Sequence, residues 1–210
     1  MNGIDLPRGR CTDGLIAFLL FATILQLVPA IAALAAPFAF VPALVWAGAW
    51  ASDPIQVIVS PLASQFLLSS LFNAVFNGVF LLIAGRFVER SVGPVGLALT
   101  FVAGAYAGAL ARLLLSWGSP LPTMGANAGL FAIVGAYFML YGVPRALPVP
   151  RHYGRVGQIA ALALIWILID AAFMMMDGFE FSVTFFDPLG GLAAGMALAR
   201  PLLAWRYRKA

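Results

Sequence analysis

The chain has 210 residues, of which 63% are hydrophobic and only 10% are charged, and its mean hydropathy is +0.99. A soluble globular domain is about half apolar and about a quarter charged, so this composition excludes an ordinary soluble enzyme and predicts an integral membrane protein with no nucleic-acid partner. One cysteine, Cys11, and one histidine, His152, exclude an intramolecular disulfide and a Cys/His zinc site. No cofactor or metal is expected.

Hydropathy predicts an all-α, polytopic fold with six transmembrane helices. At about 20 residues per crossing, the apolar segments fall at 14–35, 66–85, 95–115, 124–142, 156–175 and 187–204. Residues 1–13 form a short polar tail without a cleavable signal pattern, and residues 205–210 form a basic tail. The membrane domain is therefore expected at 14–204.

The segment 36–65 is apolar but is interrupted by four prolines. Phe38, Trp46 and Trp50 suit the membrane interface, so the segment is expected to be a large loop that is half-sunk in that interface. A seventh span through 38–51 is the alternative.

The charge distribution predicts the orientation. With six spans, 11 of the 12 Lys and Arg residues fall on one side, and Arg112 alone falls on the other with Asp53, Asp177, Glu180 and Asp187. Basic loops face the cytoplasm, so both termini are expected there. The short tails suggest a bacterial inner-membrane protein.

Small residues recur at a spacing of four in three of the predicted spans, which lets two helix backbones approach closely. This pattern predicts a compact bundle but no particular function. The pairs are Gly104 and Gly108, Gly125 and Gly129, and Gly191 and Gly195.

Two asparagines in the second span share one helix face, because Asn73 and Asn77 are four residues apart. Polar residues inside the membrane are costly unless they are paired. They are either interhelical hydrogen-bonding amides or part of a site shared with the fourth span.

Three segments of the chain, at residues 82–93, 125–135 and 187–195, together resemble the rhomboid family of intramembrane serine proteases. The segment L-I-A-G-R-F-V-E-R-S-V-G, residues 82–93, matches the end of the second family span, which places Asn77 on the family asparagine and Asn73 on the family histidine. The segment G-A-N-A-G-L-F-A-I-V-G matches the segment that carries the family serine, with Gly125, Phe131 and Gly135 in register.

In that second segment Asn127 stands on the serine and Ala128 stands on the glycine that follows it. The third segment, D-P-L-G-G-L-A-A-G, matches the last family span through Gly191 and Gly195, with Pro188 on the histidine and Asp187 on the preceding alanine. The resemblance covers about residues 60–200.

The resemblance implies a mechanism in which the serine attacks a peptide bond, the histidine of the last span accepts its proton, and the second span holds the oxyanion. A carboxamide such as Asn127 is not a useful nucleophile, and Pro188 has no ring nitrogen that acts as a base. The two residues of such a dyad act as one unit, so we expect this protein to be inactive as a serine protease. His152 is predicted in a cytoplasmic loop, about a membrane thickness away.

Other hydrolytic groups are weak candidates. Ser69, Ser70 and Ser116 lie near the outer face, but Lys209, the only lysine, lies at the opposite end, which excludes a Ser/Lys dyad. Asp170 and Asp187 are a conceivable aspartyl pair. Asp187 is more simply explained as a carboxylate at a helix start, followed by Pro188 in the first turn.

The sequence therefore favours a pseudoprotease that binds transmembrane segments of client proteins in a former oxyanion pocket formed by Asn73, Asn77, Gly125, Asn127 and Phe131. Membrane lipids are its other expected partners. An active protease that uses unrecognised chemistry and a protein that handles small solutes or lipids on the same fold remain as alternatives.

Overall fold

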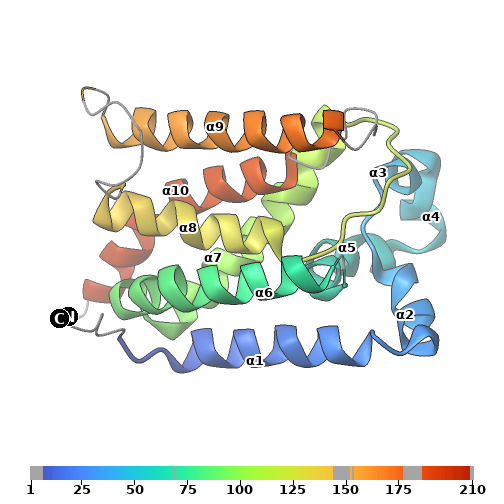
Figure 1. The fold of residues 1–210 in the computed structure, drawn as a ribbon, viewed down its shortest axis with the longest axis horizontal. Coiled ribbons are helices and arrows are strands. Elements are labelled where there is room, and N and C mark those ends of the chain that lie inside the picture. The colour runs from blue at the N-terminus through green and yellow to red at the C-terminus, as the bar shows by residue number, and fades with distance from the viewer. Residues whose placement is uncertain (1–6, 69, 144–151, 153, 177–185, 209–210) are drawn as a thin grey trace.

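The computed structural model describes residues 7–68, 70–143, 152, 154–176 and 186–208. Within these ranges the chain is all-α, apart from one isolated β-bridge between Phe40 and Thr123. Helix α1 begins and helix α10 ends at the same end of the molecule, and the short helices that follow α1 gather at the other end (Figure 1).

The first predicted span is bent. Helix α1 (Arg10–Leu25) is followed by α2 (Pro29–Ala35) at 117°, so 14–35 is not one straight helix. Pro29 lacks the N–H that a continuing helix needs, and it instead occupies the first turn of α2. The Gln26 side chain holds the corner, because its Nε2 donates to Phe66 O (2.8 Å) and its Oε1 accepts from Leu68 N (3.0 Å).

The start of α1 is capped by a residue from a distant part of the chain. The Glu89 carboxylate accepts hydrogen bonds from Cys11 N (3.0 Å), Thr12 N (2.8 Å) and Thr12 Oγ1 (2.7 Å). A carboxylate stabilises the unpaired N–H groups of a helix start. Glu89 therefore ties α1 to the residues that follow the second predicted span.

The segment expected to be an interfacial loop is a series of short helices. The alternative seventh span through 38–51 does not form, because these residues are divided among separate turns and Gly48 adopts φ +96°. Prolines stand in the first turn of several of these helices, where the missing N–H costs nothing. The elements are η1 (Ala36–Phe38), α3 (Pro42–Leu44), η2 (Val45–Ala49), α4 (Trp50–Ser52), α5 (Pro54–Ala63) and η3 (Ser64–Phe66).

The second and third apolar segments form one long helical stretch with a break. Helix α6 (Leu71–Phe80), the π-turn η4 (Leu81–Gly85) and α7 (Arg86–Leu115) are continuous except at Gly93, whose φ of +83° is not helical. Pro94 follows that break. At about 1.5 Å per residue, the portions before and after Gly93 are each about 33 Å long, so each has the length of a membrane crossing.

The remaining helices lie close to their predicted positions. They are α8 (Asn127–Tyr141), α9 (Arg155–Met176) and α10 (Phe186–Tyr207). By length and composition, Leu71–Leu115 is long and apolar enough to cross a membrane, and the bent pair Arg10–Leu25 and Pro29–Phe38 is a second candidate among the described residues. The number of six crossings therefore stays a prediction.

The core forms where α7, α8 and α10 approach one another. A Cβ placed on Gly104 or Gly108 of α7 would meet the Cβ of Ala132 or Ala128, respectively. On α10, a Cβ at Gly191 would meet the backbone carbonyl of Ala128. A Cβ at Gly195 would likewise meet the carbonyl of Ala132. Only glycine allows this approach, because any side chain would overlap the facing helix. The close backbone contact matters because apolar helices in lipid have no hydrophobic driving force for association.

We predict that Gly195→Ala destabilises the protein, although alanine is the better helix former. The new methyl group would overlap the Ala132 carbonyl, and overpacking a tight core costs about 1–3 kcal/mol. Thermal unfolding in detergent micelles measures the effect. Gly14→Ala is the matched control, since nothing lies within 4 Å of its added Cβ. Equal melting temperatures for the two variants would contradict the close approach of α8 and α10.

Candidate functional site

Asn127, the residue aligned with the family serine, begins helix α8. The turn before it is fixed by Gly125, whose φ is +91° and whose N–H donates to Ser64 O (3.0 Å). One turn further on, Gly129 N donates to Oε1 of the buried Gln65 (3.1 Å). The end of the interfacial segment thus sets the position of Asn127.

The three asparagines singled out in the sequence lie together and bond to one another. Asn73 Nδ2 donates to Asn127 Oδ1 (3.0 Å), and Asn77 Nδ2 donates to Asn73 Oδ1 (2.8 Å) and to Asn127 Oδ1 (3.3 Å). Both α6 residues therefore direct donors toward α8. The Asn127 carbonyl oxygen is occupied by these bonds, while its two N–H donors have no partner among the described contacts.

Burial differs within this asparagine cluster. Asn77 is only 1% exposed, whereas Asn73 and Asn127 are partly exposed. Asn77 Oδ1 is buried without a hydrogen-bond partner in the described part of the chain. An unpaired buried acceptor is costly. Together with the N–H donors of Asn127, it gives the cluster unused hydrogen-bonding capacity as donor and as acceptor.

The position aligned with the family histidine offers no base. Pro188 is buried in the first turn of α10, and the Asp187 backbone carbonyl lies beside Gly108 of α7. Asn127 begins α8, and His152 comes after the other end of that helix. At about 1.5 Å per residue α8 is about 22 Å long, and this length separates the two residues. The structure therefore brings no imidazole to Asn127.

The serine hydroxyls near this end are used by the backbone. Ser70 Oγ caps α6 by accepting from Asn73 N (3.0 Å), and Ser116 Oγ donates to Arg112 O (2.7 Å). Ser64 Oγ, which is buried, donates to Pro61 O (3.0 Å). Ser69 lies outside the described residues. No described serine here has an adjacent base that could activate it.

A buried ion pair lies beside Pro188. Arg112 Nη1 is 3.1 Å from Asp187 Oδ2, and the two side chains are 0% and 6% exposed. Thr123 Oγ1 bridges them, at 2.8 Å from Arg112 Nη1 and 3.2 Å from Asp187 Oδ2, while Arg112 Nη2 donates to Leu121 O (2.6 Å). This ion-pair cluster joins α7, the loop before α8 and the start of α10.

The sequence pattern does not predict this ion pair. Asp187 lies in the first turn of α10, as expected for a carboxylate at a helix start, whereas the side chain of Asp170, its other predicted partner, lies outside the described part of the structure. The described contacts of the Asp187 carboxylate are to Arg112 and Thr123. The signal was present, since Arg112 is the single basic residue on the predicted outer side and a buried charge requires a partner.

The predicted packing glycines and Phe131 lie around the asparagine cluster without contributing polar groups. A Cβ on Gly129 would meet the Phe101 ring, and one on Gly135 would meet the Leu192 carbonyl. Phe131 is half-buried and packs against the main hydrophobic core. These residues shape the helix contacts that hold Asn127.

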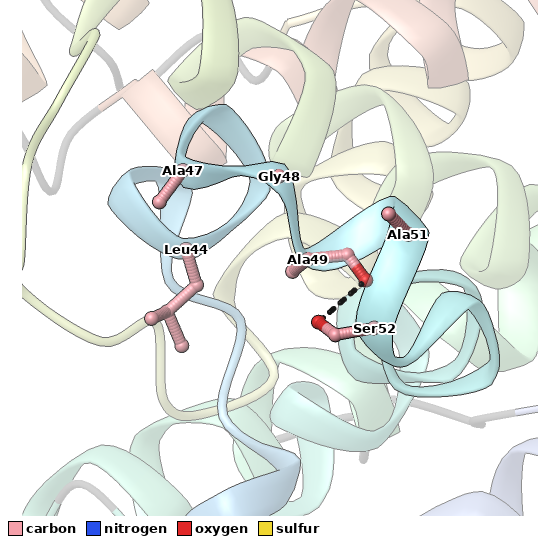
Figure 2. A pocket seen from close by; sticks show the side chains of 6 residues that line it. All are labelled: Leu44, Ala47, Gly48, Ala49, Ala51 and Ser52. Atoms are coloured by element: carbon pink, nitrogen blue, oxygen red, sulfur yellow. Dashed lines mark hydrogen bonds between the residues drawn. The ribbon is translucent and has the colours of Figure 1, made fainter.

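A separate hollow of about 440 Å³ lies in the interfacial segment (Figure 2). Its only side-chain polar group is the Ser52 hydroxyl, which donates to Ala49 O (3.4 Å). Apolar side chains complete its wall, so its described lining contains no charged group and no general base. Its lining residues are Leu44, Ala47, Gly48, Ala49, Ala51 and Ser52.

Residues 56–205 match the family model of the Rhomboid domain. This match covers more than half of the chain, which therefore belongs to the rhomboid family and is an integral membrane protein. No curated protein and no solved structure matches the chain.

We predict that Asp187→Asn or Arg112→Met alone strongly destabilises the protein. Each change leaves the other charge buried without its partner, which typically costs about 3–5 kcal/mol. The double variant Arg112→Met/Asp187→Leu removes both charges and should lose much less than the sum of the single variants. Thermal and denaturant unfolding in micelles measure these differences.

The control for this cycle is Arg86→Gln, which breaks the more exposed Arg86–Asp13 pair (2.8 Å; side chains 24% and 48% exposed). A surface pair contributes about 0–1 kcal/mol, so little change is expected. Strictly additive effects at positions 112 and 187 would show that the buried pair is not energetically coupled.

Proposed function

We propose that this chain is a rhomboid pseudoprotease that binds transmembrane segments of client proteins without cleaving them. The observation that carries the proposal is the asparagine cluster. Asn73 and Asn77 donate to the carbonyl oxygen of Asn127 (3.0 and 3.3 Å) and leave its N–H donors for a ligand. A site that donates hydrogen bonds but lacks a nucleophile favours binding over hydrolysis.

The chemistry of the aligned positions supports this assignment. Hydrolysis by a serine dyad requires a hydroxyl and an adjacent base, and removing either one lowers the rate by orders of magnitude. Here a carboxamide and a proline occupy those positions, and the nearby described serines bond to backbone atoms. The fold is retained because its helix contacts depend on glycine and alanine rather than on the dyad.

The ligand that fits the free Asn127 donors is a backbone carbonyl oxygen. In a regular transmembrane helix every carbonyl is paired within the helix, and an unpaired one in lipid is costly. A client segment interrupted by glycine, proline or a polar residue exposes such carbonyls. Binding one at Asn127 would relieve that cost, which gives the site a preference for imperfect transmembrane helices.

We further propose that the domain crosses the membrane six times, with both termini in the cytoplasm of a bacterial cell and the asparagine cluster toward the outer face. The break at Gly93 supports two crossings in the stretch Leu71–Leu115. The basic residues and the positive-inside rule support the orientation.

A crosslinking experiment tests client binding. A photoreactive phenylalanine replaces Phe72, which is 79% exposed and adjacent to Asn73, and captured peptides are identified by mass spectrometry. We expect the captured peptides to come from transmembrane segments of other proteins. Adding Asn127→Leu should lower the capture about tenfold, which corresponds to the loss of about one net hydrogen bond. Recovery of lipid alone would favour the lipid-handling alternative.

Two controls separate the site from general membrane contact. The same probe at Phe21, an exposed residue of α1, should give no capture that depends on Asn127. Gln56→Leu removes a carboxamide from α5, away from the asparagine cluster, and should leave the Phe72 products unchanged. Client capture that is indifferent to Asn127→Leu would contradict the proposed site.

We also predict that Asn127→Ser alone restores no proteolysis. The new hydroxyl would lack a general base, because position 188 is a proline and His152 lies beyond the opposite end of α8. Cleavage of a model transmembrane substrate and labelling by a fluorophosphonate probe are the two measurements. Labelling of the unaltered protein that disappears with Ser70→Ala would instead establish the active-protease alternative.

A further inference from the structure

A second hollow, of about 330 Å³, lies at the break that divides the α6–α7 stretch, at the far end of the portion before Gly93 from Asn73. Residues 92–95, around the break in α7, form one wall, and Trp205 and Arg206 of α10 form the other. Trp205 is 54% exposed and Val95 is 57% exposed. The hollow thus combines one guanidinium group with an otherwise apolar and aromatic surface.

Arg206 is fixed in place before any ligand binds. Its Nη1 donates to Glu89 O (3.2 Å) and to Arg90 O, and its guanidinium carbon lies 5.7 Å from the Tyr207 ring centroid. A guanidinium group carries five N–H donors in one plane. The described contacts use Nη1, so Nε and Nη2 can donate to a ligand in the hollow.

The charge at this end is positive. Arg90 and Arg208 are exposed beside Arg206. Both described carboxylates of this region are engaged elsewhere, since Asp13 pairs with Arg86 (2.8 Å) and Glu89 accepts from the start of α1. An anion entering the hollow therefore meets arginine side chains that form no ion pair with a carboxylate among the described residues.

We propose that this hollow binds the headgroup of an anionic phospholipid. Nε and Nη2 of Arg206 donate to the phosphodiester, an anion that the planar guanidinium fork matches in geometry. Trp205 lies at the headgroup level, where tryptophan is favoured in membrane proteins. Val92, Pro94 and Val95 contact the glycerol and upper acyl chain, which a free phosphate ion lacks.

Quenching of tryptophan fluorescence by brominated lipids tests this site in the full-length protein. In mixed vesicles, phosphatidylglycerol with brominated acyl chains should quench more than brominated phosphatidylcholine at the same mole fraction. Trp205→Phe should remove this excess, because Trp205 is the tryptophan that lines the hollow among the described side chains. Arg206→Gln should weaken the preference about fivefold, the factor that corresponds to about 1 kcal/mol per basic residue.

Arg200→Gln is the matched control, since Arg200 is an exposed arginine of the same helix outside the hollow, and the excess quenching should persist. Equal quenching by the two lipids, or an excess that survives Trp205→Phe, would overturn the proposal. So would full competition by inorganic phosphate against sodium chloride of equal ionic strength, which would indicate a free-phosphate site. If Arg206→Gln fails to fold, the proposal is still tested by the comparison of the two brominated lipids and by the effect of Trp205→Phe.

Discussion

The contact on which the rest of the structure depends is the approach of α7 and α10 to Ala128 and Ala132 of α8. Apolar helices gain nothing from association in lipid unless their surfaces fit closely. Gly104, Gly108 and Gly191, with Gly195, provide that fit by leaving no side chain between the backbones. The start of α8, and with it Asn127, is positioned by packing that involves no catalytic group.

This separation explains how the fold can persist whatever side chain stands at position 127. The turn at Gly125 is held by a hydrogen bond to the Ser64 carbonyl, and the first turn of α8 by one to the Gln65 side chain. Neither hydrogen bond involves the side chain at position 127. Asparagine there adds interhelical bonds to Asn73 and Asn77. The neutral carboxamides need no proton transfer, which suits a site that binds and releases a ligand.

The sequence contains the local part of this arrangement. Spacings of four predicted that Gly104 and Gly108, and Gly191 and Gly195, share a face, and the same spacing placed Asn73 and Asn77 on one side of α6. For Gly125 and Gly129 this prediction was wrong, because Gly125 has a φ of +91° and precedes α8. The bend at Pro29, the helices of the interfacial segment and the Arg112–Asp187 pair were not predicted. Each depends on contacts between residues far apart in the chain, such as Gln26 with Phe66, which spacing alone does not encode.

The ion pair and the proline beside it are best understood together. Pro188 fits the first turn of α10 without cost, because a backbone N–H at that position has no partner within the helix, and the anchor of this helix start comes from the residue before it. Asp187 supplies it through Arg112 and Thr123, and Arg112 in turn bonds to Leu121 O in the loop that leads to α8. The loop before Asn127 and the helix that carries position 188 are thereby tied to α7. At the position aligned with the family histidine the chain thus has a structural joint, which in the function proposed above holds the pocket in shape for a bound segment.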